Sequence, residues 1–221
     1  MKPLSKYKAL IFDMDGTLVD NMHYHHDAWI QFIDEKQLGI DAETFERDYH
    51  KGTIVEVMAR FCPHLKSEEA LRAMGNEKEI LYRDTFGSLL QPLPGLHSFF
   101  EYLKAKDIPL GLATMGDQNN LDMTLKQLKI ETYFHSTTGG DQVTKGKPHP
   151  EIFLRAAAKI KMAPEYCLAF EDTQSGIQSA QAAGMDVVGV ATQFSKQQLL
   201  NLGCVNAIAD YTEMVLNPYK P

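Results

Sequence analysis

The chain has 221 residues, of which 44% are hydrophobic and 23% charged, and its formal net charge is −7 at pH 7. This composition is typical of globular proteins and excludes collagen-like and disordered chains, and no apolar run approaches the roughly 18 residues that a membrane span needs. The acidic balance offers no basic surface to nucleic acid or to an anionic membrane, so we expect neither as a partner.

Strand and helix patterns alternate along most of the chain, with one long helical interruption. Residues 8–12 (KALIF) form a continuous apolar run that predicts a strand buried on both faces. From about residue 22 to residue 87 only helical spacings occur, which is far more than a crossover between strands needs. Beyond them we predict strands at 109–114, 133–137, 167–170, 186–190 and 207–209, and helices at 96–106, 119–128, 150–161, 175–183 and 196–202.

This alternation predicts an α/β fold with a doubly wound, mostly parallel sheet. We assign residues 1–20 and 88–221 to the core that carries the sheet, and residues 21–87 to an inserted helical domain. No internal repeat is evident, so the two parts are expected to differ in both structure and role.

Polar residues follow several of the predicted strands. Asp13, Thr114 and Asp172 each stand at or just after the end of an apolar run, and Lys147 lies in a loop that leads into a helix. Because ligands of open α/β sheets bind at the carboxyl ends of the strands, we expect these side chains to meet at one edge. Asp15 joins them through the tight turn that follows the first strand.

Three aspartates gathered at one edge repel one another unless a cation compensates them. Mg²⁺ suits such a site, since it prefers a few carboxylates together with water and substrate phosphate. One aspartate can then act as a nucleophile, and a second can exchange protons with the leaving group. Thr114 and Lys147 can bind phosphoryl oxygens. The pattern therefore predicts phosphoryl transfer.

Four stretches, taken in order, resemble the haloacid dehalogenase superfamily of phosphotransferases. They are Asp13-Met-Asp-Gly-Thr, the strand LGLAT that ends at Thr114, Gly146-Lys-Pro-His-Pro-Glu-Ile-Phe and Phe170-Glu-Asp-Thr-Gln-Ser-Gly-Ile. The resemblance implies a Rossmann-like core with a mobile four-helix cap. It also implies that Asp13 forms an aspartyl phosphate, and that Asp15 is the general acid and base and offers its backbone carbonyl to the metal.

By the same resemblance, Thr114 and Lys147 bind the phosphoryl group, Asp172 holds Mg²⁺ with Asp13 and Asp15, and Glu171 supports these groups. The second aspartate of the first motif argues against dehalogenation, which this superfamily performs without that residue and without Mg²⁺.

The start of the inserted domain is similar to the β-phosphoglucomutase branch of the superfamily. That likeness implies that His25 meets the acid/base Asp15 and that Lys51, in the Lys51-Gly52 pair, contacts substrate. The mutase has an arginine for the remote phosphate three residues after that glycine, where this chain has Val55. It also has a Ser-Lys-Asn run where this chain has Gly116-Asp117-Gln118. Arg47 or Arg60 could take the place of the missing arginine.

We therefore expect a Mg²⁺-dependent phosphatase that acts on a small phosphorylated metabolite: a sugar phosphate, a polyol phosphate or a nucleotide. A sugar-phosphate mutase is the first alternative, and a non-catalytic protein that binds metal or phosphate is the second. Three widely spaced cysteines and an N-terminus without a signal-peptide pattern predict a cytoplasmic protein. We expect a monomer, with a dimer as the alternative.

Overall fold

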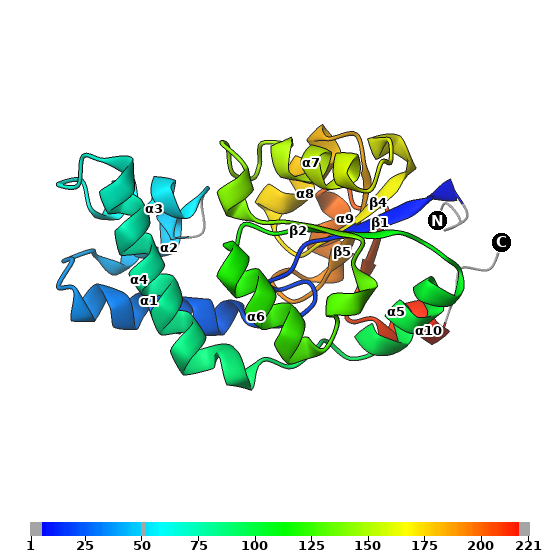
Figure 1. Cartoon of the computed structure of the whole chain (residues 1–221), viewed down its shortest axis with the longest axis horizontal. Coiled ribbons are helices and arrows are strands. Elements are labelled where there is room, and N and C mark those ends of the chain that lie inside the picture. Colours follow the sequence, from blue (N-terminus) through cyan, green and yellow to red (C-terminus); the bar gives the residue numbers. More distant parts are fainter. Residues whose placement is uncertain (1–5, 50–51, 217–221) are drawn as a thin grey trace.

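A computed structural model describes residues 6–49 and 52–216 of the chain. Its centre is a six-stranded parallel sheet with the strand order β3-β2-β1-β4-β5-β6 (Figure 1). The strands are β1 Ala9–Phe12, β2 Leu110–Ala113, β3 Ser136–Thr138, β4 Cys167–Glu171, β5 Asp186–Val190 and β6 Asn206–Ile208. Because β2 and β4 flank β1, the carboxyl ends of these three strands lie side by side. The expected parallel α/β sheet is confirmed.

Helices cover both faces of this sheet, and alternate residues of each strand serve opposite faces. On one face, Leu10 and Phe12 of β1 pack with α5 (Leu96–Ala105), α6 (Gln118–Leu128) and α10 (Thr212–Leu216). On the other face, Ala9 and Ile11 pack with α7 (Glu151–Lys159), α8 (Gln174–Ala182) and α9 (Lys196–Asn201). The residues of β1 on both faces are fully buried. This explains why the strands appear in the sequence as continuous apolar runs.

The four helices that lie between β1 and α5 in the sequence project to one side of the sheet (Figure 1). They are α1 (Met22–Glu35), α2 (Ala42–Asp48), α3 (Ile54–Phe61) and α4 (Glu68–Phe86), and we call them the helical insert. They enclose a separate apolar cluster that includes Trp29, Phe32, Phe45, Val57, Met58 and Phe61. The side chains of Asp41, Thr53 and Ser67 cap α2, α3 and α4 by accepting backbone N–H bonds, which fixes where each helix begins.

Two details of the sequence prediction were wrong. Residues 131–133 form a short 3-10 turn, so the strand expected from residue 133 begins only at Ser136. Helix α10, near the C-terminus, was not predicted, because its five residues are too few for a periodic pattern. Within the described ranges, no helix combines the length and the apolar composition that crossing a membrane requires.

Candidate active site

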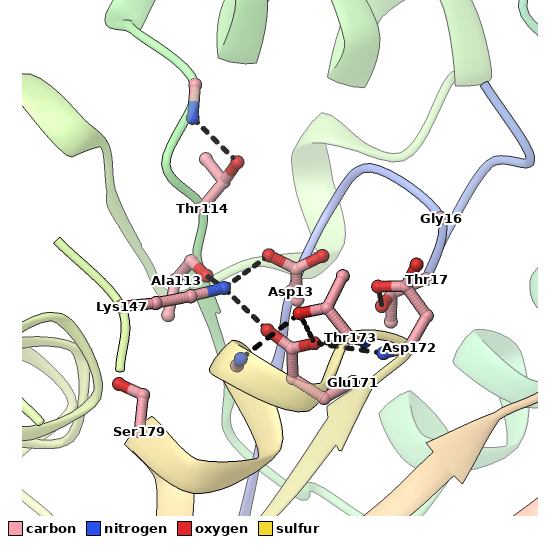
Figure 2. Close-up of polar contacts among 12 residues, drawn as sticks. Asp13, Gly16, Thr17, Ala113, Thr114, Lys147, Glu171, Asp172, Thr173 and Ser179 are labelled. Atoms are coloured by element: carbon pink, nitrogen blue, oxygen red, sulfur yellow. Dashed lines mark hydrogen bonds and ion pairs between the residues drawn. The ribbon is translucent and has the colours of Figure 1, made fainter. Parts of the chain in front are cut away.

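The predicted polar residues meet at the carboxyl edge of the sheet. In the register of the sheet, Phe12 of β1 pairs with Leu112 of β2 and with Phe170 of β4. The residues that follow these partners therefore emerge together, and Asp13, Thr114 and Asp172 are all buried there. Figure 2 shows Asp13 between Thr114 and Asp172, beside the ammonium of Lys147.

Lys147 reaches this edge from the loop that precedes α7. Its Nζ donates to Oδ1 of Asp13 at 2.6 Å, to Oε1 of Glu171 at 2.7 Å and to the carbonyl of Ala113 at 3.1 Å (Figure 2). All three donor positions of the ammonium are thus used. Burial lowers the pKa of Lys147, but the charges of Asp13 and Glu171 outweigh it and raise the pKa overall. Lys147 therefore stays cationic beside Asp13.

Glu171 is held rigidly in its place. Its Oε2 accepts hydrogen bonds from the backbone N–H groups of Asp172 and Thr173, at 2.9 and 3.0 Å, and from the hydroxyl of Thr173 at 3.1 Å. Helix α8 passes so close that a side chain at Gly176 would overlap this carboxylate. Glu171 thus presents its other oxygen, Oε1, to Lys147.

Asp13, Glu171 and Asp172 form a buried acidic cluster in which carboxylate oxygens lie within 4.8 Å of one another. Burial, opposed by Lys147 and reinforced by Glu171, raises the pKa of Asp13 to about 7. Burial and then the charges of Glu171 and Asp13 raise the pKa of Asp172 well above its usual range. The partners of Asp172 are the hydroxyls of Thr17 and Thr192, at 3.3 and 3.4 Å.

These residues fit a divalent cation. When all three carboxylates are ionised they face one described ammonium, that of Lys147, which leaves two negative charges uncompensated within this part of the chain; the raised pKa values of Asp13 and Asp172 express this crowding. Neutral hydroxyls on Asp172 do not replace a cation. The donors are hard oxygens, the kind that Mg²⁺ and Ca²⁺ prefer over nitrogen or sulfur.

Asp15 lies in a second polar group, at the start of the helical insert. Its Oδ1 accepts a hydrogen bond from Nδ2 of Asn21 at 2.6 Å, and Nε2 of His25 lies 3.5 Å from the same oxygen. Burial raises the pKa of Asp15, but His25 and then Asn21 outweigh it, so the pKa is lowered overall. Lys78 of α4 lies 3.3 Å from Nδ1 of His25, and the His25 ring stacks on Tyr82 at 3.8 Å.

A cavity of about 820 Å³ separates the sheet edge from the helical insert, and both parts line it. Asp13, Asp15, Thr114 and Lys147 are among its wall residues on the sheet side, and His25 and Lys78 are among those from the insert. Thr114 directly follows β2, and its hydroxyl accepts a hydrogen bond from the backbone N–H of Gly116 at 3.0 Å. The predicted Lys51 lies outside the described residues.

The structure also distinguishes Arg47 from Arg60, the two arginines that could replace the missing arginine of the mutase. Arg60 of α3 lines the cavity, whereas Arg47 forms an ion pair with Asp48 and is 55% exposed. Lys78, Glu79 and Asn21 also belong to this site, but sequence analysis did not find them. Nothing in the periodicity of α4 distinguishes Lys78 from a surface lysine, although its side chain is only 2% exposed.

Known proteins are similar to this chain in sequence and in fold. A family model described as haloacid dehalogenase-like hydrolase matches residues 7–184. A phosphorylated carbohydrates phosphatase of Thermotoga maritima is 31% identical over 219 residues, 96% of this chain and 98% of that protein. A β-phosphoglucomutase of Bacillus subtilis is 33% identical over 191 residues, 83% of each protein.

The fold agrees with this relationship. The crystal structure of a family IA, variant 3 HAD hydrolase from Entamoeba histolytica has a TM-score of 0.82 to this chain, with 29% identity, and the match covers 93% of this chain and 94% of that one. The motif resemblance noted above is therefore confirmed along most of the sequence. The chain belongs to the haloacid dehalogenase-like hydrolases.

Proposed function

We propose that this protein is a Mg²⁺-dependent phosphatase that hydrolyses a small phosphorylated metabolite through an aspartyl phosphate on Asp13. The observation that carries the proposal is the pairing of Asp13 with Lys147 at 2.6 Å, inside a buried acidic cluster and on the wall of a cavity that Asp15 also lines. The similarity to a phosphatase of phosphorylated carbohydrates supports a sugar phosphate or a related ester as substrate.

In the first step, a carboxylate oxygen of Asp13 attacks phosphorus and the bond from phosphorus to the ester oxygen breaks. Asp15 enters this step with the proton that it took from water in the second step of the preceding turnover, and gives that proton to the departing oxygen. The N–H of Lys147 that now points to Asp13 would turn to a non-bridging phosphoryl oxygen as Asp13 attacks, and Thr114 would bind another, so that both stabilise the charge that develops there. Lys147 is already fixed by Glu171 and by the carbonyl of Ala113, so its position costs little reorganisation.

In the second step, a water molecule attacks the aspartyl phosphate. Asp15, now a carboxylate, takes a proton from that water, the acyl phosphate bond breaks, and Asp13 and inorganic phosphate are released. The contacts from Asn21 and His25 to Asp15 favour the carboxylate, which is the form that this step uses.

Asp13, Asp172 and the backbone carbonyl of Asp15 would hold Mg²⁺. When bound, the ion offsets the charge of the acidic cluster and of the phosphoryl group. The chain's own contribution is to position Asp172, which accepts a hydrogen bond from the hydroxyl of Thr17.

The helical insert, assigned to residues 21–87, would act as the cap of this active site. It supplies His25, Lys78 and Glu79 to the cavity wall, opposite the sheet edge. Closing it over bound substrate would exclude bulk water and leave only the attacking water near Asp13. Such a cap also determines which leaving group fits.

A sugar-phosphate mutase, which would return the phosphoryl group to a second hydroxyl, is the alternative. One observation favours it: Arg60 lines the cavity and could bind a remote phosphate although Val55 stands where the mutase has arginine. Phosphorus NMR with Mg²⁺, β-glucose 1-phosphate and a trace of glucose 1,6-bisphosphate separates the two activities. Glucose 6-phosphate without free phosphate indicates the mutase, and growth of inorganic phosphate indicates the phosphatase.

Release of phosphate from p-nitrophenyl phosphate and from a panel of sugar and polyol monophosphates tests the proposal. We expect turnover with Mg²⁺, loss of turnover with EDTA, and no turnover by the Asp13→Asn variant. The exposed Asp20→Asn variant is the matched control and should keep wild-type rates. Turnover by Asp13→Asn would reject the nucleophile, and a wild type that binds phosphate but hydrolyses no ester would indicate a non-catalytic protein.

A further inference from the structure

Side-chain hydrogen bonds join helix α4 of the helical insert to the first turn of α6, beside the cavity. Nδ2 of Asn120 donates to Oε2 of Glu79 at 2.6 Å, and Arg83 donates to Oδ1 of Asn120 at 2.7 Å. Arg83 also lies 3.5 Å from Asp117, the residue that caps α6. Glu79 and Asn120 both line the cavity, so this network fixes part of its wall across the two parts of the molecule.

Glu79 contributes a negative charge to this wall. Its side chain is only 12% exposed, and Lys78 donates to its Oε1 at 3.0 Å. Burial raises the pKa of Glu79, but the charges of Lys78 and His25 and the bond from Asn120 outweigh it, so the pKa lies below its usual range. Glu79 is therefore a carboxylate at neutral pH.

The position of Glu79 places this charge on the side of the leaving group. A chain of close contacts joins it to Asp15: 3.0 Å from Glu79 to Lys78, 3.3 Å from Lys78 to His25 and 3.5 Å from His25 to Asp15. In the proposed function, Asp15 protonates the oxygen of the departing alcohol. The rest of that alcohol then lies in the cavity that Asp15 and Glu79 both line.

The carboxylate of Glu79 determines which functional groups of the leaving alcohol can lie beside it. A carboxylate accepts about four hydrogen bonds, and each oxygen of Glu79 receives one from the described residues, from Lys78 or Asn120. Hydroxyl groups of a substrate can donate to the remaining positions. A second phosphate or a carboxylate on the substrate would instead meet a like charge in a partly dehydrated wall, where repulsion is strong.

We propose that Glu79, oriented by Asn120 and Lys78, is a specificity-determining residue that accepts hydroxyl groups of the leaving alcohol and rejects a second anionic group. This inference rests on the proposed function and narrows its substrate class to polyhydroxylated monophosphates, such as sugar and polyol monophosphates, as opposed to bisphosphates. The charge of Lys78 is then compensated by Glu79. Lys78 contacts His25, and through it Asp15, and does not bind a remote phosphate.

Inhibition of p-nitrophenyl phosphate hydrolysis measures this selectivity whether or not a probe is itself turned over. The probes are fructose 1-phosphate and fructose 1,6-bisphosphate, which differ by one phosphate group. We expect the wild type to bind the monophosphate more tightly. In Glu79→Gln, the ratio of the two inhibition constants should shift toward the bisphosphate by about tenfold, because a like charge is removed.

Two variants isolate the charge. Glu79→Asp keeps the carboxylate and should keep the preference for the monophosphate, whereas Glu77→Gln, on the exposed side of the same helix, should leave the ratio unchanged. The ratio also cancels any effect on the reference reaction that reaches Asp15 through Lys78. A wild type that prefers the bisphosphate, or an equal ratio in wild type and Glu79→Gln, overturns the inference while the phosphatase activity stands. Absence of any p-nitrophenyl phosphate hydrolysis overturns both proposals.

Discussion

The side-chain amide of Asn21 lies 2.6 Å from Oδ1 of Asp15. Asn21 occupies the N-cap position of α1, yet its side chain makes no capping bond to that helix. Its Oδ1 accepts the backbone N–H of Gly16 at 3.2 Å instead, and its Nδ2 is shared between Asp15 and the hydroxyl of Tyr82. One residue thus joins the start of the helical insert to the proposed general acid and base.

We expect Asn21→Ala to lower kcat about tenfold, since a hydrogen bond to a charged group contributes roughly 1.5–3 kcal/mol. KM should change less, because Asn21 does not line the cavity. Steady-state hydrolysis of p-nitrophenyl phosphate measures both constants. Tyr82→Phe is the control, because it removes the other partner of the amide and keeps the bond to Asp15. Equal losses in kcat for the two variants would contradict a specific action on Asp15.

Removal of metal is expected to act on stability as well as on turnover. Mg²⁺ should raise the melting temperature of the wild type, because an ion that binds only the folded state stabilises it by mass action. Asp172→Asn should abolish this rise and, without metal, should melt no lower than the wild type, because burial and the neighbouring carboxylates already disfavour the charged form of Asp172, so a neutral amide of the same size costs little. Thermal unfolding with EDTA and with Mg²⁺ measures both effects.

Asp20→Asn serves as the control for that experiment, since Asp20 is exposed. It should show the full wild-type response to Mg²⁺. An undiminished response in Asp172→Asn would mean that the ion binds elsewhere.

The residues at the sheet edge could be predicted because each one is marked by its immediate neighbours in the sequence. Asp13, Thr114 and Asp172 each follow an apolar run, and parallel strands end at one edge, so their meeting needed no knowledge of side-chain packing. Lys147 was predicted from the motif that begins at Gly146. Glu171 was expected as a supporting residue, whereas its bond to Lys147 was visible only in the structure.

The insert side of the cavity could not be predicted in the same way. Lys78 and Glu79 stand in a helix rich in charged residues, and their burial depends on how α4 packs on α1 and α6. The Lys78 ammonium lies 5.0 Å from the ring centre of Trp29 and 5.5 Å from that of Tyr82. Contacts between helices so far apart in sequence leave no periodic signal in either one.

Glu79 should make stability depend on acid pH. Because its pKa is lower in the folded chain than its usual value, the stabilisation is present above that usual value of 4.5 and is lost as pH falls through the folded pKa. Between neutral pH and about pH 3, the free energy of unfolding of Glu79→Gln should therefore fall less than that of the wild type. Urea unfolding at several pH values tests this, and Glu69→Gln, at an exposed position of the same helix, should follow the wild type.

Gly176 of α8 leaves the space that the carboxylate of Glu171 occupies in the acidic cluster. A methyl group there would overlap the carboxylate of Glu171, which three hydrogen bonds hold in place and which in turn binds Lys147. We expect Gly176→Ala to keep the fold but to lower kcat by about tenfold or more, because misplacing a residue that stabilises the transition state is costly. Gly111→Ala is the control, since its nearest neighbour, Ile11, would lie 3.5 Å from the new carbon. If both variants hydrolyse p-nitrophenyl phosphate at the wild-type rate, the position of Glu171 does not limit turnover.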